Sequence, residues 1–271
     1  PTHLVDRAFA VLLAGGSAFG LDAAAGVMRF LEERGRGFPT RHGAVPVVPT
    51  AIIYDRGIGD SSARPGPEMA HEAASAAAEG IPVAEGSVGV GAGASVGKLK
   101  GIEHATKGGV GSFGLTGKGD LAVGAVVVVN AFGDVLDPDR GAIVAGARRT
   151  PRSLRLLDSA KQIAAGHMAT SFAGANTTLA VVATNARLTG SPLHWLASWA
   201  SDELARRLRP AFTAVDGDVV VALATGRVHA EPHQVGLLAQ RAVGAALLRA
   251  VMEAEPLGGL PAASQLSPLS V

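Results

Sequence analysis

Runs of apolar residues alternate along this chain with glycine-containing turns and with segments of helical periodicity. Several of the runs are apolar at consecutive positions, as in strands that are buried on both faces. They predict strands over Ala8 to Leu13, Val110 to Leu115, Leu121 to Val129, Thr177 to Asn185 and Val219 to Thr225. The stretch from Val45 to Tyr54 is predicted to be extended and interrupted by its prolines.

Between these runs the apolar spacing becomes that of helices. One helix is expected after Gly15-Gly16, with Ser17 as its cap. Its apolar face is expected to carry Leu21, Ala24, Ala25, Met28 and Leu31. Further helices are expected over Pro67 to Glu79, Ser191 to Arg207 and Pro232 to Glu253. Residues 256–271 show no such pattern and are expected to form a loose tail. Since strands and helices alternate without a hinge-like linker, the pattern predicts one α/β domain over residues 1–271.

Composition narrows the function classes. Of the 271 residues, 48% are hydrophobic and 17% are charged, and the net charge is +1, which argues against a nucleic-acid partner held by bulk electrostatics. The absence of cysteine excludes disulfides, thiolate catalysis and cysteine-bound zinc. The apolar stretches near residues 8–21 and 121–132 are too short or too glycine-rich to span a bilayer, and no signal peptide opens the sequence, so a cytoplasmic protein without a membrane partner is expected. The arginines of residues 148–155 are expected on a solvated loop.

Asn176-Thr177-Thr178 is the most informative stretch, because it places a small hydroxyl where a glycine-containing turn enters a buried strand. The β-branch of threonine restricts side-chain rotation, so the hydroxyl of Thr177 can be aimed. If the bond before Thr177 were cut, that residue would carry a nucleophile together with a base, an α-amine whose pKa is about 7.7–8. Two other interpretations stay open: a turn that uses Asn and Thr for conformational reasons, and an N-glycosylation acceptor.

Three further side chains could stabilise an oxyanion. Lys98 ends a glycine-rich stretch that resembles a phosphate loop but lacks its first glycine and its hydroxyl, because Ala92 and Leu99 stand at those positions. Tyr54 is the only tyrosine of the chain, and Asn130 ends the predicted strand that precedes it. Each of the three also has a purely structural interpretation: a surface lysine, a packing tyrosine and a strand cap.

Asp216 and Asp218 flank Gly217 just before the strand from Val219. An Asp-Gly pair favours a hairpin turn. In the functional alternative, the two carboxylates orient the amine and the hydroxyl of Thr177 or bind the ammonium group of a substrate. His229 and His233 have the spacing of a helical zinc pair, but the proline between them disrupts that geometry, and neither a metal nor a cofactor is expected.

Taken in order, six of these segments resemble the self-processing aminopeptidases, a family that includes the L-aminopeptidase/D-esterase, the β-peptidyl aminopeptidases and the nylon-oligomer hydrolases. The segments are Leu13 to Leu21, Ala51 to Asp55, Gly91 to Lys98, Val127 to Asn130, Asn176 to Asn185 and Asp216 to Asp218. The resemblance runs over most of the chain. It implies the fold of the N-terminal-nucleophile hydrolases, a four-layer α-β-β-α sandwich.

The resemblance also implies a chemistry. Self-cleavage between Asn176 and Thr177 would give an α chain of residues 1–176 and a β chain of residues 177–271. Thr177 would then attack small peptides or ω-amino amides through an acyl-enzyme. The residues at family positions near the nucleophile are Tyr54, Lys98, Asn130, Asp216 and Asp218. A threonine nucleophile with two aspartates resembles the nylon-oligomer hydrolase branch more than the serine-using aminopeptidases. Relatives are commonly oligomers of αβ pairs, so a homo-oligomer is expected.

Two departures and two alternatives accompany this interpretation. The resemblance implies a further family segment before Pro1, so the numbered sequence is expected to be incomplete. Ala175 also stands between Gly174 and Asn176, where close relatives have glycine directly before asparagine. One alternative is an acyltransferase of the ornithine acetyltransferase type, in which an acceptor amine replaces water. The other is a relative that does not cleave itself and only binds small molecules.

Overall fold

The computed structural model describes residues 5–167 and 176–271, and its central feature is a sheet with the strand order β13-β11-β8-β7. The sequence departure at Gly174 and Ala175 lies outside the described residues. The strands of this sheet are β7 (Gly109–Thr116), β8 (Ala122–Asn130), β11 (Thr177–Ala186) and β13 (Val219–Val228). β11 runs antiparallel to β8 and parallel to β13. All four strands were predicted from the apolar runs.

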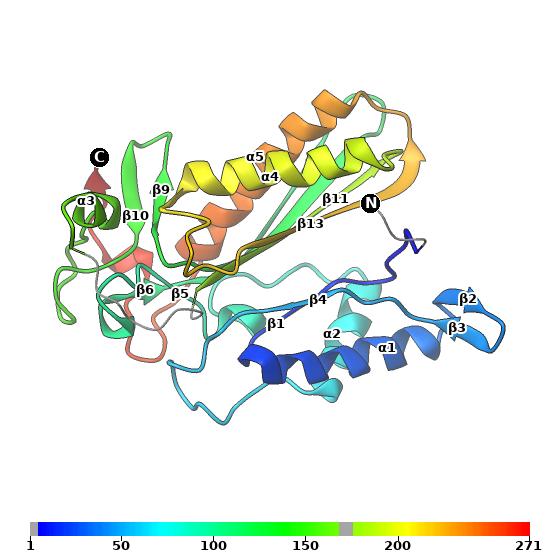
Figure 1. Ribbon diagram of the computed structural model, residues 1–271, viewed down its shortest axis with the longest axis horizontal. Helices are drawn as coiled ribbons and strands as arrows, with labels where there is room; N and C mark the ends of the chain where they lie inside the picture. The colour runs from blue at the N-terminus through cyan, green and yellow to red at the C-terminus, as the bar shows by residue number, and fades with distance from the viewer. Residues whose placement is uncertain (1–4, 168–175) are drawn as a thin grey trace.

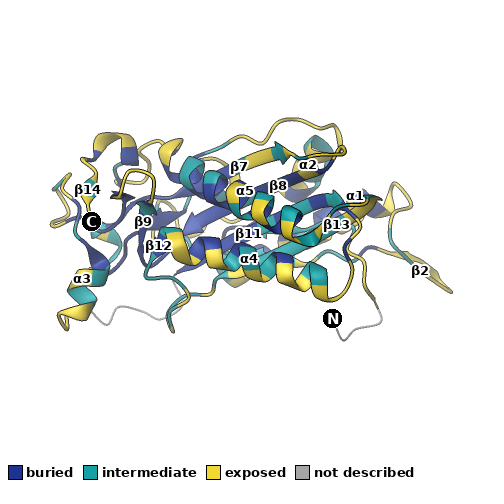
Figure 2. Ribbon diagram, turned by 90° about the horizontal axis from the view of Figure 1, so that it is seen from above, coloured by how far each residue is buried: buried dark blue, intermediate teal, exposed yellow. Residues whose placement is uncertain are grey.

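Two long helices, α4 (Ser191–Arg207) and α5 (Pro232–Met252), cover one face of this sheet (Figure 1). Valine side chains of the strands, such as Val127 and Val182, form one apolar cluster with Val243 and Leu247 of α5. Figure 2 shows that the exposed positions of both helices point away from the buried strands. By length and composition α5 could cross a membrane, and its burial against α4 and the sheet accounts for that composition.

The opposite face of the sheet carries a second β layer and then a second helix layer (Figure 1). The β layer contains β1 (Leu12–Ala14) and β4 (Thr50–Ile52), which pair in parallel. Ile53 packs between the two β layers against Val128 and Leu179. The outer helices are α1 (Ala24–Glu32), which follows the 3-10 helix η1 (Ser17–Ala23), and α2 (Pro67–Ala78). The arrangement is the predicted four-layer α-β-β-α sandwich.

The remaining elements close the ends of the sandwich. A further sheet with the order β12-β9-β10-β14 consists of β9 (Asp134–Asp137), β10 (Ala142–Ala145), β12 (Leu208–Arg209) and β14 (Leu269–Ser270). Two short pairs are β2 (Phe38–Thr40) with β3 (Gly43–Val45), and β5 (Ser95–Val96) with β6 (Thr106–Lys107). The short helices are α3 (Ser159–Ala164), η2 (Gly89–Gly91), η3 (Ile102–His104) and η4 (Ala263–Gln265).

Of two predictions about surface segments, one was wrong and the other was confirmed only in part. Residues 256–271 do not form a loose tail, because β14 pairs with β10 and Ala262 is fully buried. Among the arginines of residues 148–155, Arg149, Arg152 and Arg155 are exposed as predicted, but Arg148 is 3% exposed. Its guanidinium donates to the carbonyls of Ala105 at 3.1 Å and Glu103 at 2.7 Å. Both β14 and Arg148 thus have backbone partners far along the chain, which local sequence pattern does not reveal.

The apolar face predicted for the first helix was confirmed only in part. Gly16, with φ of 82°, precedes the helix, and Ser17 makes no side-chain cap. Leu31 is buried as predicted, but Leu21 and Met28 are 48% and 38% exposed, and Val27 and Phe30 are buried instead. The segment starts as a 3-10 helix, which has three residues per turn, so its faces are rotated from those of an α-helix over the same residues.

Close packing of β7 on α5 provides a test of this core. A Cβ added at Gly111 would lie 2.2 Å from the carbonyl oxygen of Ala246, whereas one added at Gly114 would meet nothing within 4 Å. Gly111→Ala is therefore expected to lower the free energy of unfolding by about 1–3 kcal/mol through overpacking. Gly114→Ala on the same strand should leave it unchanged or slightly higher. Urea titration of both variants measures the difference, and equal values would show that α5 does not pack this tightly.

Candidate active site

The pairing of β11 with both of its neighbours brings the predicted site residues together at its first residue. On one side, the antiparallel register places Asn130, the last residue of β8, opposite Thr177. On the other side, Asn176 forms a parallel bridge with Asp216. Residues 216–218 therefore run beside 176–178 and lead into β13, so the hairpin interpretation of the Asp-Gly pair was wrong. Thr177 is 8% exposed.

The carbonyl oxygen of Asn176 receives two hydrogen bonds. The hydroxyl of Thr177 donates to it at 2.6 Å and the backbone N–H of Gly217 donates to it at 2.9 Å. A Cβ at Gly217 would lie only 3.1 Å from Thr177 Oγ1. The hydroxyl is thus held against the peptide bond that precedes its own residue, and a backbone donor already points at the oxygen on which charge would develop.

The two aspartates bind backbone groups around Thr177. Asp218 Oδ1 accepts from the N–H of Thr178 at 2.5 Å, and its Oδ2 accepts from the N–H of Phe212 at 3.1 Å. Asp216 accepts from the N–H of Phe132 at 3.3 Å. Burial raises the pKa of Asp218, the hydrogen bond from Thr178 opposes that shift, and the nearby charge of Asp216 adds to it. The carboxylates therefore form a negatively charged border on the β13 side of Thr177.

Lys98, Asn130 and Tyr54 meet on the β8 side. The ammonium of Lys98 donates to Asn130 Oδ1 at 2.7 Å and to its carbonyl oxygen at 2.9 Å. The amide nitrogen of Asn130 donates to the carbonyl oxygen of Tyr54 at 3.1 Å. Burial lowers the pKa of Lys98 to about 7, although the charges of Asp216, Asp218 and Asp55 act in the opposite direction. A lysine with this pKa changes charge within the physiological pH range.

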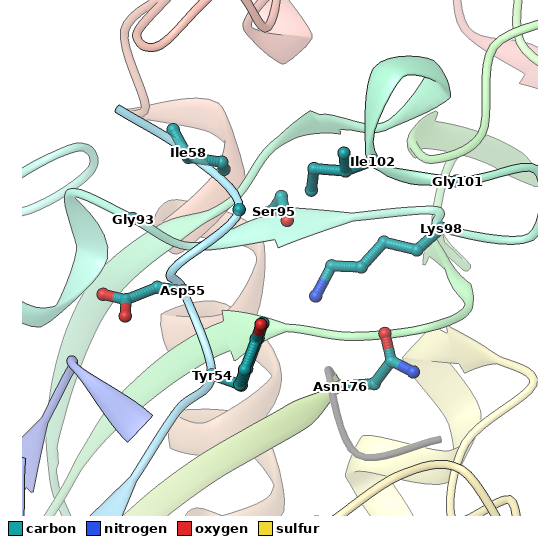
Figure 3. A pocket seen from close by; sticks show the side chains of 10 residues that line it. Tyr54, Asp55, Ile58, Gly93, Ser95, Lys98, Gly101, Ile102 and Asn176 are labelled. Carbon is teal, nitrogen blue, oxygen red and sulfur yellow. The ribbon is translucent and has the colours of Figure 1, made fainter. Parts of the chain in front are cut away.

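A cavity of about 210 Å³ opens in front of these groups. Figure 3 shows the Lys98 side chain reaching into it, with Tyr54 and Asn176 on one side and Ile58 and Ile102 on the other. Asn176 Oδ1 is buried and has no hydrogen-bond partner within the described part of the chain. The cavity thus combines apolar walls with polar groups at the end next to Thr177, as small-molecule sites commonly do.

Three residues of this region were missed from the sequence. Ser95 lines the cavity, and its N–H donates to Asn130 Oδ1 at 3.1 Å. Gly217 supplies the donor to the Asn176 carbonyl. Lys107 is fully buried, and its ammonium donates at 2.7 Å to the carbonyls of both Gly91 and Ala94 in the glycine-rich loop before Ser95. The position of Gly217 between two aspartates was a sequence signal for that residue. Lys107 lies in a weakly patterned segment that gave no such signal.

Sequence comparisons agree with one another. The sequence model of peptidase family S58 matches residues 2–263. An uncharacterized aminopeptidase of Mycobacterium leprae (strain TN) is 41% identical over 290 residues, which cover 96% of this chain and 76% of that protein. A 6-aminohexanoate-oligomer endohydrolase of Kocuria sp. (strain KY2) is 30% identical over 229 residues, which cover 82% of this chain and 62% of that protein.

A solved structure supports the fold. The L-aminopeptidase D-Ala-esterase/amidase of Ochrobactrum anthropi, described as a prototype for the serine aminopeptidases and a new variant of the Ntn hydrolase fold, matches with a TM-score of 0.58 and 22% sequence identity. The match covers 93% of this chain and 68% of that chain. At this identity the likeness concerns the fold, and it agrees with the four layers described above.

Lys107 provides a test of how the loop that carries Ser95 and Lys98 is held. Lys107→Met would keep the apolar stem but remove the ammonium from the carbonyls of Gly91 and Ala94, which would keep only the backbone N–H donors of Ala94 and Gly108. We expect a loss of about 1–3 kcal/mol in the free energy of unfolding, since a hydrogen bond to a charged group contributes about 1.5–3 kcal/mol. Lys118→Met, at an exposed lysine, is the matched control and should change little. Chemical denaturation compares the two, and an equal loss in both would contradict the anchoring role.

Proposed function

This chain belongs to peptidase family S58, and we propose that it is a self-cleaving amide hydrolase in which Thr177 is the nucleophile. The single observation that carries the proposal is the contact of the Thr177 hydroxyl with the carbonyl oxygen of Asn176, to which the N–H of Gly217 also donates. Small peptides or ω-amino amides are the proposed substrates. The printed names of the relatives, an aminopeptidase and a 6-aminohexanoate-oligomer endohydrolase, support that class.

Self-cleavage follows from this geometry in two steps. Thr177 Oγ1 attacks the carbonyl carbon of Asn176, the C–N bond breaks, and the departing nitrogen takes up a proton to become the α-amine of Thr177. The hydroxyl proton is lost in the same step, and the carbonyl of Asn176 is left as an ester on Oγ1. Water then hydrolyses the ester, which releases the carboxylate of Asn176 and restores the hydroxyl. The N–H of Gly217 would stabilise the oxyanion of the first step.

The cleaved protein would use the same hydroxyl on an external amide. The new α-amine of Thr177 is a base in the same residue, and its pKa of about 7.7–8 suits proton transfer near neutral pH. The substrate would enter the cavity lined by Tyr54, Lys98 and Asn176, where the Lys98 ammonium, held by Asn130, supports the charge that develops on its carbonyl oxygen. Asp216 and Asp218 would orient the amine of Thr177 or bind a substrate's ammonium. Water completes the cycle by hydrolysing the acyl-enzyme.

Intact mass spectrometry tests the nucleophile. The purified chain is expected to yield two fragments that separate before Thr177, and Thr177→Ala is expected to remain whole because it has no hydroxyl to attack Asn176. Thr177→Ser, which keeps the hydroxyl, should still be cleaved. A single uncut chain in the parent protein would contradict self-processing and would favour a binding protein.

The pH dependence of amide hydrolysis tests Lys98. Its charged form is present below its folded pKa of about 7 and is lost above it, so activity should fall on the alkaline side of the optimum. The acidic side should report the α-amine of Thr177, which must be neutral to act as a base, and a bell-shaped profile is expected. Lys98→Arg stays charged throughout, so its profile should have a lower maximum but no alkaline decline. An unchanged alkaline limb in this variant would assign that limb to another group.

A further inference from the structure

The wall of the cavity opposite Tyr54 is supported from outside by a tight turn near the C-terminus. Ile58 lines the cavity together with Ile102, as Figure 3 shows. Behind Ile58 lies the turn Leu257-Gly258-Gly259-Leu260, which does not itself line the cavity. The backbone of Leu257 donates to Leu260 at 3.3 Å, and the backbone of Leu260 donates back at 3.1 Å.

The turn is rigid and fixed to the body of the protein. Gly258 and Gly259 have φ of 60° and 81°, the positive values that a two-residue type I′ turn requires at both central positions. On one side of the turn, the N–H of Lys107 donates to the carbonyl of Pro261 at 2.9 Å. On the other side, the hydroxyl of Ser87 donates to the carbonyl of Glu255 at 2.8 Å. These hydrogen bonds therefore hold the backbone of the turn in place when a neighbouring side chain packs against it.

The two glycines have different surroundings. A Cβ at Gly258 would lie 2.2 Å from Cγ2 of Ile58, and no real contact of this kind is that short. A Cβ at Gly259 would meet nothing within 4 Å. Ile58 can therefore keep its position in the cavity wall only if residue 258 is glycine.

We propose that the turn of residues 257–260 sets the width of the pocket that receives the acyl side chain of the substrate, through the contact of Gly258 with Ile58. The inference rests on the proposed function, since it takes the cavity beside Thr177 as the acyl site. The facing isoleucines, Ile58 and Ile102, give this part of the cavity an apolar lining. The substrates it selects are amides whose acyl part carries an aliphatic side chain, and Gly258 is a specificity-determining residue that never touches them.

The test compares Gly258→Ala with Gly259→Ala. Both variants place an L-residue at positive φ, but only the first also displaces Ile58, so Gly258→Ala should lose more thermal stability than Gly259→Ala. The readout is the ratio of kcat/KM for leucine p-nitroanilide to that for alanine p-nitroanilide. We expect a fall of about tenfold in Gly258→Ala, because a small change in an apolar pocket discriminates by about 10–200-fold per methylene, and no change in Gly259→Ala.

A second background separates pocket width from general damage. Ile58→Ala removes the methyl that the new Cβ would strike, so Gly258→Ala should have no further effect on the ratio in that background. If the ratio falls equally in Gly258→Ala and Gly259→Ala, or falls again in the Ile58→Ala background, the turn does not act through Ile58 and the proposal is wrong.

A binding measurement distinguishes failure of this inference from failure of the proposed function. Leucinamide and alaninamide are titrated into the parent protein and both glycine variants, and the ¹³C-methyl signals of Ile58 and Ile102 are followed by NMR. Shifts of these signals, with leucinamide selectively weakened in Gly258→Ala, support the pocket even in a chain without turnover. If neither amide moves the signals, the acyl pocket lies elsewhere, whatever mass spectrometry shows about Thr177.

Discussion

The register of β11 between two unlike neighbours is the constraint on which the site depends. Side chains alternate along a strand, so a slip of one residue against β8 would turn Thr177 to the other face of the sheet and would no longer place Asn130 opposite it. The parallel pairing with β13 fixes the 216–218 segment in the same way. The nearly unbroken burial of β11 makes such a slip unfavourable, because it would exchange residues that pack against α4 and α5 for residues that pack against β4. Core packing therefore determines where the chemistry sits.

Around this frame, backbone carbonyls help to satisfy buried charges. Lys98 and Lys107 both donate to carbonyl oxygens, and burial lowers the pKa of each, that of Lys107 to about 8. An ammonium that binds carbonyls keeps its place but becomes easier to deprotonate than one that is paired with a carboxylate. Carbonyl-held cations thus suit a site in which protons must move, and the many glycines of residues 86–97 let the backbone approach closely enough to supply the carbonyls.

Sequence pattern predicted the parts of the molecule in which local periodicity and burial agree. The strands of the central sheet, α2, α4 and α5 are of this kind, and the order of the short motifs indicated the four layers. The exposure of Arg148 and the structure of residues 256–271 were predicted wrongly, because each depends on partners far along the chain. The face of the first helix was predicted only in part, because the segment starts as a 3-10 helix. In the candidate site, side chains with intrinsic chemistry were found from the sequence, whereas Gly217 acts through its backbone N–H and Ser95 and Lys107 through three-dimensional position. The residue type alone does not indicate contributions of these two kinds.

The interlacing of the two halves of the chain has a consequence for assembly. β8 and β10 precede residue 176, and they are hydrogen-bonded to β11 and β14, which follow it. While the chain is continuous, these strands meet as parts of one molecule at a high effective concentration. Once the bond before Thr177 is cut, the same contacts join two separate polypeptides, and an unfolded protein could regain them only by a bimolecular encounter that depends on concentration. Cleavage would then leave the folded molecule intact but would make its unfolding irreversible in dilute solution, where the two polypeptides rarely meet.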